Sequence, residues 1–105
     1  MQTFSQRVVR LALSVPKGRV TTYGRIARAA GGGGQSARSV TAILGKAHDA
    51  GEKDIPFHRI VYADGRAWLP GEYAAKRRKL YAAEGIEVGS DGRIKEFADR
   101  VFDFK

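Results

Sequence analysis

Four consecutive glycines at positions 31–34 restrict this chain more than any other feature, because no helix continues through them. Each glycine in a helix interior costs about 1 kcal/mol relative to alanine. The segments on both sides nevertheless have helical patterns. Thr22 can cap a helix that runs to Ala30, and Ser36 can cap a second helix with the sequence SARSVTAILGKA. We therefore predict two helices joined by a glycine-rich turn, which is the outline of a helix-turn-helix.

A glycine-rich loop can instead hold a phosphate group. The sequence does not favour that interpretation, because the run lacks the GxxxxGK[ST] pattern and no buried strand precedes it. The helical interpretation gives each helix a consistent apolar face. The residues on those faces are Ile26, Ala27 and Ala30 in the first helix, and Ala37, Val40, Ile43 or Leu44, and Ala47 in the second.

The rest of the chain predicts two further helices. Thr3 and Gln6 form a capping box before an amphipathic helix that ends at PKG, residues 16–18, and residues 19–21 are expected to be extended. The segment GEYAAKRRKLYAAEG predicts a helix that Gly85 closes. Its inward residues are predicted to be Tyr73, Leu80 and Ala83.

Two Asp-Gly pairs, at 64–65 and 91–92, predict two small hairpins, and the tail ADRVFDF is apolar enough to pack back on the body. The sum is an α+β fold, mostly helical, of winged-helix character. We expect a single domain over 1–105. Within it, 1–48 is a basic half with the helix-turn-helix, 49–88 holds a further motif and a helix, and 89–105 forms the C-terminal hairpin and tail.

The charges are distributed unevenly along the chain. Through His48 there are eight lysines and arginines and no acidic residue, and from Asp49 onward eleven basic residues face eleven acidic ones. The whole net charge of +8 therefore arises in the first half. A surface of one sign favours a polyanionic partner, most often a nucleic acid, although a solvated basic surface is the simpler interpretation.

The chain contains no cysteine and only two histidines. This composition excludes disulfides, a thiolate nucleophile and cysteine-bound zinc, and we expect neither a metal nor a cofactor. No run of eighteen apolar residues exists, so no membrane span is expected. The composition fits a cytoplasmic protein.

The outer face of the helix after the glycines supports the nucleic-acid interpretation. Arg38, Ala42 and Gly45 share one stripe, with Thr41 beside it. One long cation among small side chains lets a helix backbone approach a groove closely while the arginine projects into it. Tyr23, at the start of the preceding helix, can bond a phosphate oxygen, although such a tyrosine is more often a core residue.

Taken in order, VPKGRVTTYGRIARAAG, ARSV, IPFHRIV, DG and KLYAAEG resemble the DNA-binding domain of the O6-alkylguanine-DNA alkyltransferases. The resemblance runs from about Phe4 to Val88. The hallmark of that family is Pro-Cys-His-Arg, whose cysteine accepts the alkyl group, and this chain has Pro56-Phe57-His58-Arg59 instead. Phenylalanine has no lone pair for the transfer, so the chain resembles the alkyltransferase-like branch, which binds alkylated guanine without repairing it.

The resemblance also implies roles for individual residues. Tyr23, with Thr22 beside it, would press on the phosphate 3′ to the target nucleotide, and Arg38 would enter the stack as the base leaves. The helix set into the minor groove would present Ser36, Ala37, Thr41, Ala42 and Gly45. The lesion pocket would comprise Pro56, Phe57, His58 and Arg59, with Glu84 orienting the histidine, and with Trp68 and Pro70 nearby.

Three departures from the family pattern concern the same pocket. The Asn-Pro that precedes the hallmark is missing from KAHDAGEKDIP, and Pro70 stands where the family has a tyrosine or an arginine. Trp68 either lines the pocket or packs beneath the loop, and we favour packing. The run KRRK at 76–79 is interpreted as a solvated helix face.

Three functions remain as alternatives. The first is a monomeric, non-enzymatic sensor that binds O6-alkylguanine in duplex DNA, flips the base and engages nucleotide excision repair proteins in a prokaryotic nucleoid. The second is a winged-helix transcription regulator, which would read bases with polar side chains where this helix has small ones. The third is an enzyme in which His58 and Glu84 activate water.

Overall fold

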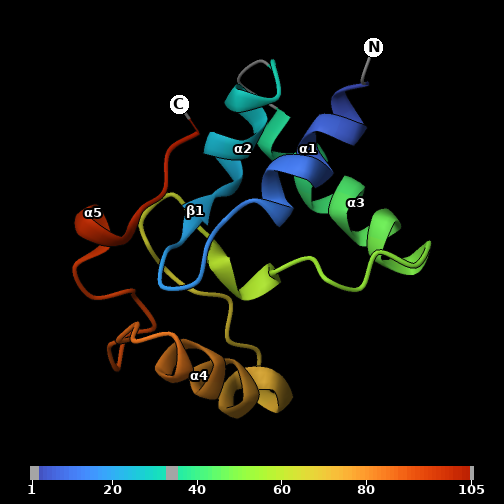
Figure 1. Cartoon of the computed structure of the whole chain (residues 1–105). Helices are drawn as coiled ribbons and strands as arrows, with labels where there is room; N and C mark the ends of the chain where they lie inside the picture. Colours follow the sequence, from blue (N-terminus) through green and yellow to red (C-terminus); the bar gives the residue numbers. More distant parts are fainter. Residues whose placement is uncertain (1–2, 33–35, 105) are drawn as a thin grey trace.

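The computed structural model describes residues 3–32 and 36–104. Three helices, α1 (Phe4–Leu13), α2 (Tyr23–Ala29) and α3 (Ser36–Asp49), pack together at one end, and α4 (Ala74–Ala83) lies at the other (Figure 1). The predicted capping box precedes α1: the Gln6 amide donates to the Thr3 hydroxyl at 3.1 Å, and the Thr3 amide donates to the Gln6 side chain at 2.9 Å. Thr22 caps α2 as predicted, and accepts from the amide of Arg25 at 3.2 Å.

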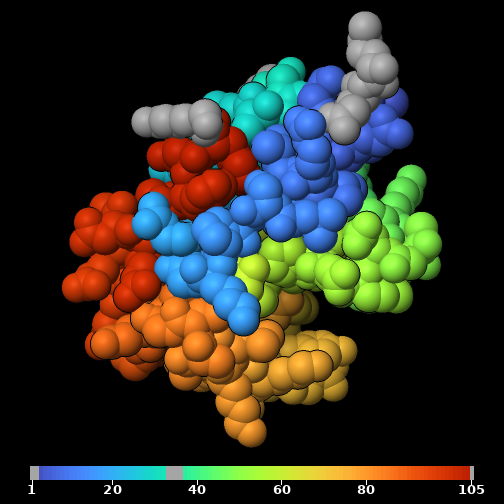
Figure 2. All heavy atoms as spheres, viewed as in Figure 1, coloured from blue at the N-terminus to red at the C-terminus, as the bar shows by residue number. Residues whose placement is uncertain are grey.

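A two-stranded parallel sheet lies between the helical ends. β1 (Thr21–Thr22) pairs with β2 (Ile60–Val61), with Thr21 opposite Ile60. The tail returns as predicted: Val101 pairs with Val20, and the Phe102 amide donates to the Val20 carbonyl at 2.6 Å. Figure 2 shows this C-terminal segment lying against the segment that leads into β1.

The apolar interior forms two clusters that meet at β2. The first lies among α1, α2 and α3, and includes Val8, Ile26, Leu44 and Ile60. The second lies beneath α4, and includes Val20, Val61, Ala67, Tyr81, Ile86 and Ile94. Because side chains alternate along a strand, the neighbours Ile60 and Val61 enter different clusters.

The hairpin predicted around Asp64-Gly65 forms at its turn but does not extend beyond it. The Gly65 amide donates to the Tyr62 carbonyl at 2.9 Å. Gly65 has φ +87°, and a Cβ there would lie 3.1 Å from the ring of Phe97, so the turn needs glycine. The Tyr62 amide donates to the Arg66 carbonyl at 3.0 Å across the turn, but β2 pairs with β1, and Arg66 also bridges to Arg93. The hairpin predicted around Asp91-Gly92 forms, with Val88 opposite Ile94 in an antiparallel bridge.

The inward face predicted for the helix over 71–85 is wrong. A 3₁₀ turn, η2 (Gly71–Tyr73), precedes α4 and sets its phase so that Tyr81 is buried. The side chains predicted to face inward, Tyr73, Leu80 and Ala83, are exposed. Tyr81 tolerates burial because its hydroxyl donates to the carbonyl of His58. Gly85 follows the helix with φ +72°, as a helix-closing glycine does.

Two predictions concern residues or side chains that the structure does not describe. Ser36 is the first residue of α3, and its predicted capping role falls outside the side chains that the structure describes. The middle of the glycine run lies outside them as well, although Gly31, at φ +92°, already ends α2. No helix within 3–32 and 36–104 is long and apolar enough to cross a membrane.

Candidate nucleic-acid interface

A cavity of about 690 Å³ lies between the α2–α3 pair and the segment that leads into α4. It brings together residues that the sequence places far apart. Its lining residues are Tyr23, Gly24, Ala37, Arg38, Thr41, Gly45, Phe57, Tyr62, Ala63, Trp68 and Arg77. No carboxylate lines it, and the side chains are mostly apolar or aromatic with a cation at two points.

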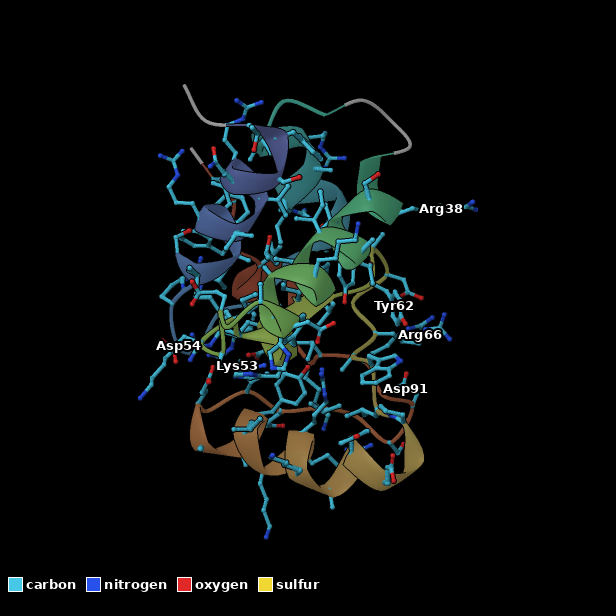
Figure 3. The ribbon with its side chains drawn as sticks, turned by 90° about the vertical axis from the view of Figure 1, so that its right-hand side faces the viewer. Arg38, Lys53, Asp54, Tyr62, Arg66 and Asp91 are labelled. Carbon is cyan, nitrogen blue, oxygen red and sulfur yellow. The ribbon has the colours of Figure 1, made fainter. Side chains whose placement is uncertain are left out.

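The residues predicted to form one outer face of α3 line two different hollows in the structure. Arg38 is exposed, and Figure 3 shows it projecting outward on the side of the molecule where Tyr62 and Arg66 also lie. Ala37, Thr41 and Gly45 line the cavity, together with Arg38. Ala42 faces away from the cavity, and lines a separate groove between α1 and α3. Arg38, Thr41 and Ala42 of the predicted stripe are exposed, and the contact of this stripe with DNA stays a prediction.

Tyr23 stands at the edge of the cavity, directly after the capping residue Thr22, which is buried. The ring of Tyr23 lies 6.3 Å from that of Tyr62, at an interplanar angle of 45°. Burial and the nearby Tyr62 raise the pKa of Tyr23, while Arg77 opposes the rise. The phenol therefore keeps its proton near neutral pH, and it can donate to a phosphate oxygen without a charge of its own.

Phe57 lines the cavity and is half-buried. It opens a single 3₁₀ turn, η1 (Phe57–Arg59), after the buried Pro56. The ring meets His48 edge-on at 5.8 Å between centroids. An aromatic hydrocarbon at this point offers contact area but no atom that can form a covalent bond with a ligand.

His58 and Arg59 lie beneath the cavity and do not line it, because both turn toward Glu84 at the end of α4. The Nε2 atom of His58 lies 2.6 Å from Oε2 of Glu84. Arg59 binds the same carboxylate in a bidentate manner, with its Nη2 atom 2.8 Å from Oε2 and its Nε atom 3.0 Å from Oε1. The amide of Gly18 donates to Oε1 at 3.2 Å. The glutamate thus joins three separate segments of the chain.

The carboxylate of Glu84 stays ionised over the working pH range of a protein. Burial acts to raise its pKa, but the hydrogen bonds from Arg59, His58 and the Gly18 amide outweigh it and lower the pKa to about 2. The side chain is only 7% exposed. This arrangement supports the floor of the cavity, and its imidazole and carboxylate are occupied with each other.

The wall opposite α3 differs most from the sequence-based expectation. Trp68 is 44% exposed and lines the cavity, so the interpretation that it packs beneath the loop is wrong. Pro70 does not line the cavity, and it immediately precedes η2. The KRRK run is a solvated face at Lys76, Arg78 and Lys79, but Arg77 is half-buried and lines the cavity.

Four lining residues were not predicted from the sequence: Gly24, Tyr62, Ala63 and Arg77. A signal exists for Tyr62, because it follows the buried pair Ile60-Val61 at the end of a strand, where side chains often meet a ligand. No local signal separates Arg77 from the other three cations of its run. Among the described residues, no three His, Asp or Glu side chains converge as a metal site would require.

Comparison with known proteins shows the family of this chain. The 6-O-methylguanine DNA methyltransferase DNA-binding domain matches residues 3–86, most of the chain. The chain belongs to this family. Its relatives include a DNA base-flipping protein of Escherichia coli, 35% identical over 92 residues that cover 88% of this chain and 69% of that protein. A DNA base-flipping protein of Vibrio parahaemolyticus is 34% identical over 94 residues, which cover 90% of this chain and 91% of that one.

Two solved structures of the family show the same fold. Atl1 of S. pombe, crystallised with damaged DNA containing O6-carboxymethylguanine, superposes with a TM-score of 0.72 at 27% identity, and covers 99% of this chain and 100% of that one. The O6-methylguanine methyltransferase of Mycobacterium tuberculosis gives a TM-score of 0.60 at 32% identity, with coverage of 80% of this chain and 49% of that one. The predicted fold class, mostly helical α+β, and the predicted family are therefore confirmed.

Proposed function

We propose that this protein is a non-enzymatic DNA-damage sensor. It binds duplex DNA that contains O6-alkylguanine, rotates the modified base into the cavity and retains it there for nucleotide excision repair proteins. The observation that carries the proposal is the cavity itself: Tyr23, Arg38 and Phe57 all line it, and Phe57 stands at the position that the family gives to its acceptor cysteine. The names of the base-flipping relatives and the damaged-DNA complex of Atl1 support it.

The cavity favours binding over alkyl transfer. Transfer needs a thiolate or another polarisable nucleophile beside the alkyl carbon, and the chain contains no cysteine. His58 and Glu84 hold each other beneath the cavity, so they are poorly placed to activate water against the alkyl group. The ring of Phe57 instead provides apolar surface, on which each buried methylene contributes roughly 0.8 kcal/mol.

The surrounding residues suit base flipping. Extruding a base costs a few kcal/mol of stacking and pairing, and less where alkylation has already weakened the pair. In the proposed complex, Arg38 fills the vacated stack, Tyr23 contacts the 3′ phosphate, and the small residues of α3 allow close approach in the minor groove. We propose that the protein acts as a monomer.

The test compares duplexes of one sequence, with and without O6-methylguanine, titrated against the protein by fluorescence anisotropy. A 2-aminopurine next to the lesion reports loss of stacking. We expect tighter binding to the lesion and an increase in 2-aminopurine fluorescence. Equal affinities would refute the sensor and favour a sequence-reading regulator, and recovery of unmodified guanine would show an enzyme.

Arg38→Ala tests the flipping mechanism in the same assay. We expect about tenfold weaker lesion binding and a smaller fluorescence increase, because stacking contacts contribute about 1–3 kcal/mol each. Arg28→Ala is the matched control, since Arg28 is an exposed cation of α2 that does not line the cavity. Retained flipping in Arg38→Ala would refute the assigned role.

A further inference from the structure

The wall of the cavity opposite α3 contains a cation that the proposed function does not use. The guanidinium carbon of Arg77 lies 4.8 Å from the centroid of the Trp68 ring, in a cation–π contact. Trp68 is itself stacked against Tyr73, with 6.3 Å between ring centroids and 25° between their planes. Arg77 extends from α4, whereas Trp68 belongs to the preceding loop, so two elements hold the guanidinium in place.

Within residues 3–32 and 36–104, Arg77 forms no ion pair with an acidic side chain. All ion pairs between basic and acidic side chains of these residues are formed by cations other than Arg77. No aspartate or glutamate lines the cavity either. Among the described residues, the other cation that lines the cavity is Arg38, which projects toward solvent and enters the DNA stack in the proposed complex. The guanidinium of Arg77 is therefore an uncompensated positive charge beside aromatic walls.

The charge of Arg77 reaches across the cavity to the far side. It acts against the rise in the pKa of Tyr23 that burial and Tyr62 cause, and against the larger rise that burial causes at Tyr81, whose pKa is about 12. These two tyrosines stand on different elements, α2 and α4. Tyr23 and Arg77 both line the cavity, so a group bound beside Tyr23 would lie near this positive charge.

We propose that Arg77 makes the cavity selective for O6-substituents that end in an anionic group, such as a carboxylate, over neutral substituents of equal size. This inference rests on the proposed function and specifies its ligand class. A carboxylate in a mostly apolar cavity gains a charge-assisted hydrogen bond from a guanidinium that the tryptophan already orients. A neutral amide of the same shape makes only an ordinary hydrogen bond there.

The experiment uses four duplexes of one sequence, which carry guanine, O6-methylguanine, O6-carboxymethylguanine or O6-(carbamoylmethyl)guanine. The last two differ in charge and hardly in shape. Dissociation constants are measured at one salt concentration for the wild-type protein, Arg77→Gln, Arg77→Lys and Arg78→Gln. Arg78 is the matched control, because it is the next cation of the same helix but is exposed and lies outside the cavity.

We expect the wild-type protein to prefer the carboxylate over the amide by about tenfold, the factor that one charge-assisted hydrogen bond supplies. Arg77→Gln should reduce this ratio to near one, Arg77→Lys should keep part of it, and Arg78→Gln should keep all of it. An unchanged ratio in Arg77→Gln would overturn the inference. Weakening of all four duplexes by the same factor would also overturn it, since Arg77 would then be a phosphate contact.

The two proposals fail in different ways. If the wild-type protein binds O6-methylguanine and plain guanine equally, the lesion sensor is refuted. If it prefers the lesion but does not distinguish the carboxylate from the amide, the sensor stands and the role of Arg77 is refuted. Circular dichroism of each variant at the assay temperature confirms that the comparison is among folded proteins.

Discussion

Replacing Glu84 with glutamine should destabilise the protein strongly, although the two side chains have nearly the same shape. Glu84 accepts hydrogen bonds from Arg59, His58 and the amide of Gly18, and so ties the turn after α1, the η1 turn and the end of α4 together. Glutamine removes the negative charge and turns an NH₂ group toward donors. The remaining amide oxygen could still accept one hydrogen bond from Arg59, which would lose its bidentate contact but keep its bond to the Val15 carbonyl at 3.0 Å.

The size of the effect follows from the pKa of Glu84. A fall from the usual 4.5 to about 2 means that the folded state favours the ionised form. The linkage relation converts this fall to roughly 3 kcal/mol of folding stability at neutral pH. The amide oxygen of glutamine keeps part of the hydrogen bonding, so we expect a loss of about 2 kcal/mol on substitution. For a domain of this size, that loss lowers the melting temperature by roughly 10 °C.

The assay is urea and thermal unfolding at pH 7, followed by circular dichroism at 222 nm. The matched control is Glu87→Gln, because Glu87 is 77% exposed and its contact with Lys95 is 3.6 Å long. We expect that control to change stability by less than about 0.5 kcal/mol. If Glu84→Gln lost no more stability than Glu87→Gln, the carboxylate of Glu84 would not hold the three segments together as the distances indicate.

The wild-type protein and Glu84→Gln also allow a test of how stability depends on pH. Because the folded-state pKa of Glu84 is lower than its unfolded value, its stabilisation is fully present above pH 4.5 and is lost as pH falls toward 2. The wild-type advantage over Glu84→Gln should therefore shrink between pH 5 and pH 2. A constant difference over this range would contradict the assignment.

Three further predictions concern other parts of the molecule. Phe57→Cys should not restore alkyl transfer, because Pro70 and the altered loop before the motif depart from the family pattern; a protein mass increased by one methylene after incubation with O6-methylguanine DNA would contradict this. Thr22→Ala should cost about 1 kcal/mol in urea unfolding through loss of the α2 cap, and Thr22→Ser should recover most of it. The logarithm of the DNA association constant should fall linearly with the logarithm of salt concentration, and a flat dependence would exclude phosphate contacts.

The features that could be predicted from the sequence are those that depend on local chemistry. The caps at Thr3 and Thr22 need only a hydroxyl at the right spacing from an amide, and both form. The burial of Ile26 and Leu44 follows from helical periodicity. Tyr23, Arg38 and Phe57 were found through the order of the family motifs, and the structure brings them to one cavity.

The features that could not be predicted depend on tertiary packing. The phase of α4 is set by the η2 turn, which moves the buried position from Leu80 to Tyr81. The parallel pairing of β2 with β1 joins segments almost forty residues apart, and the local turn signal at Asp64-Gly65 predicts only the short contact between Tyr62 and Arg66. The place of Arg77 depends on Trp68, and nothing within the KRRK run distinguishes it.

The meeting of the two apolar clusters at β2 has a consequence for how this binding site can be altered. One wall of the cavity belongs to the helical bundle and the other to the α4 side, and the short β1–β2 sheet, with two residues in each strand, lies where the two clusters meet. The distance between the two walls can therefore be changed by substitutions in the core, at side chains such as Val61 that do not line the cavity. Directed evolution toward bulkier adducts thus has a route that leaves every lining residue in place.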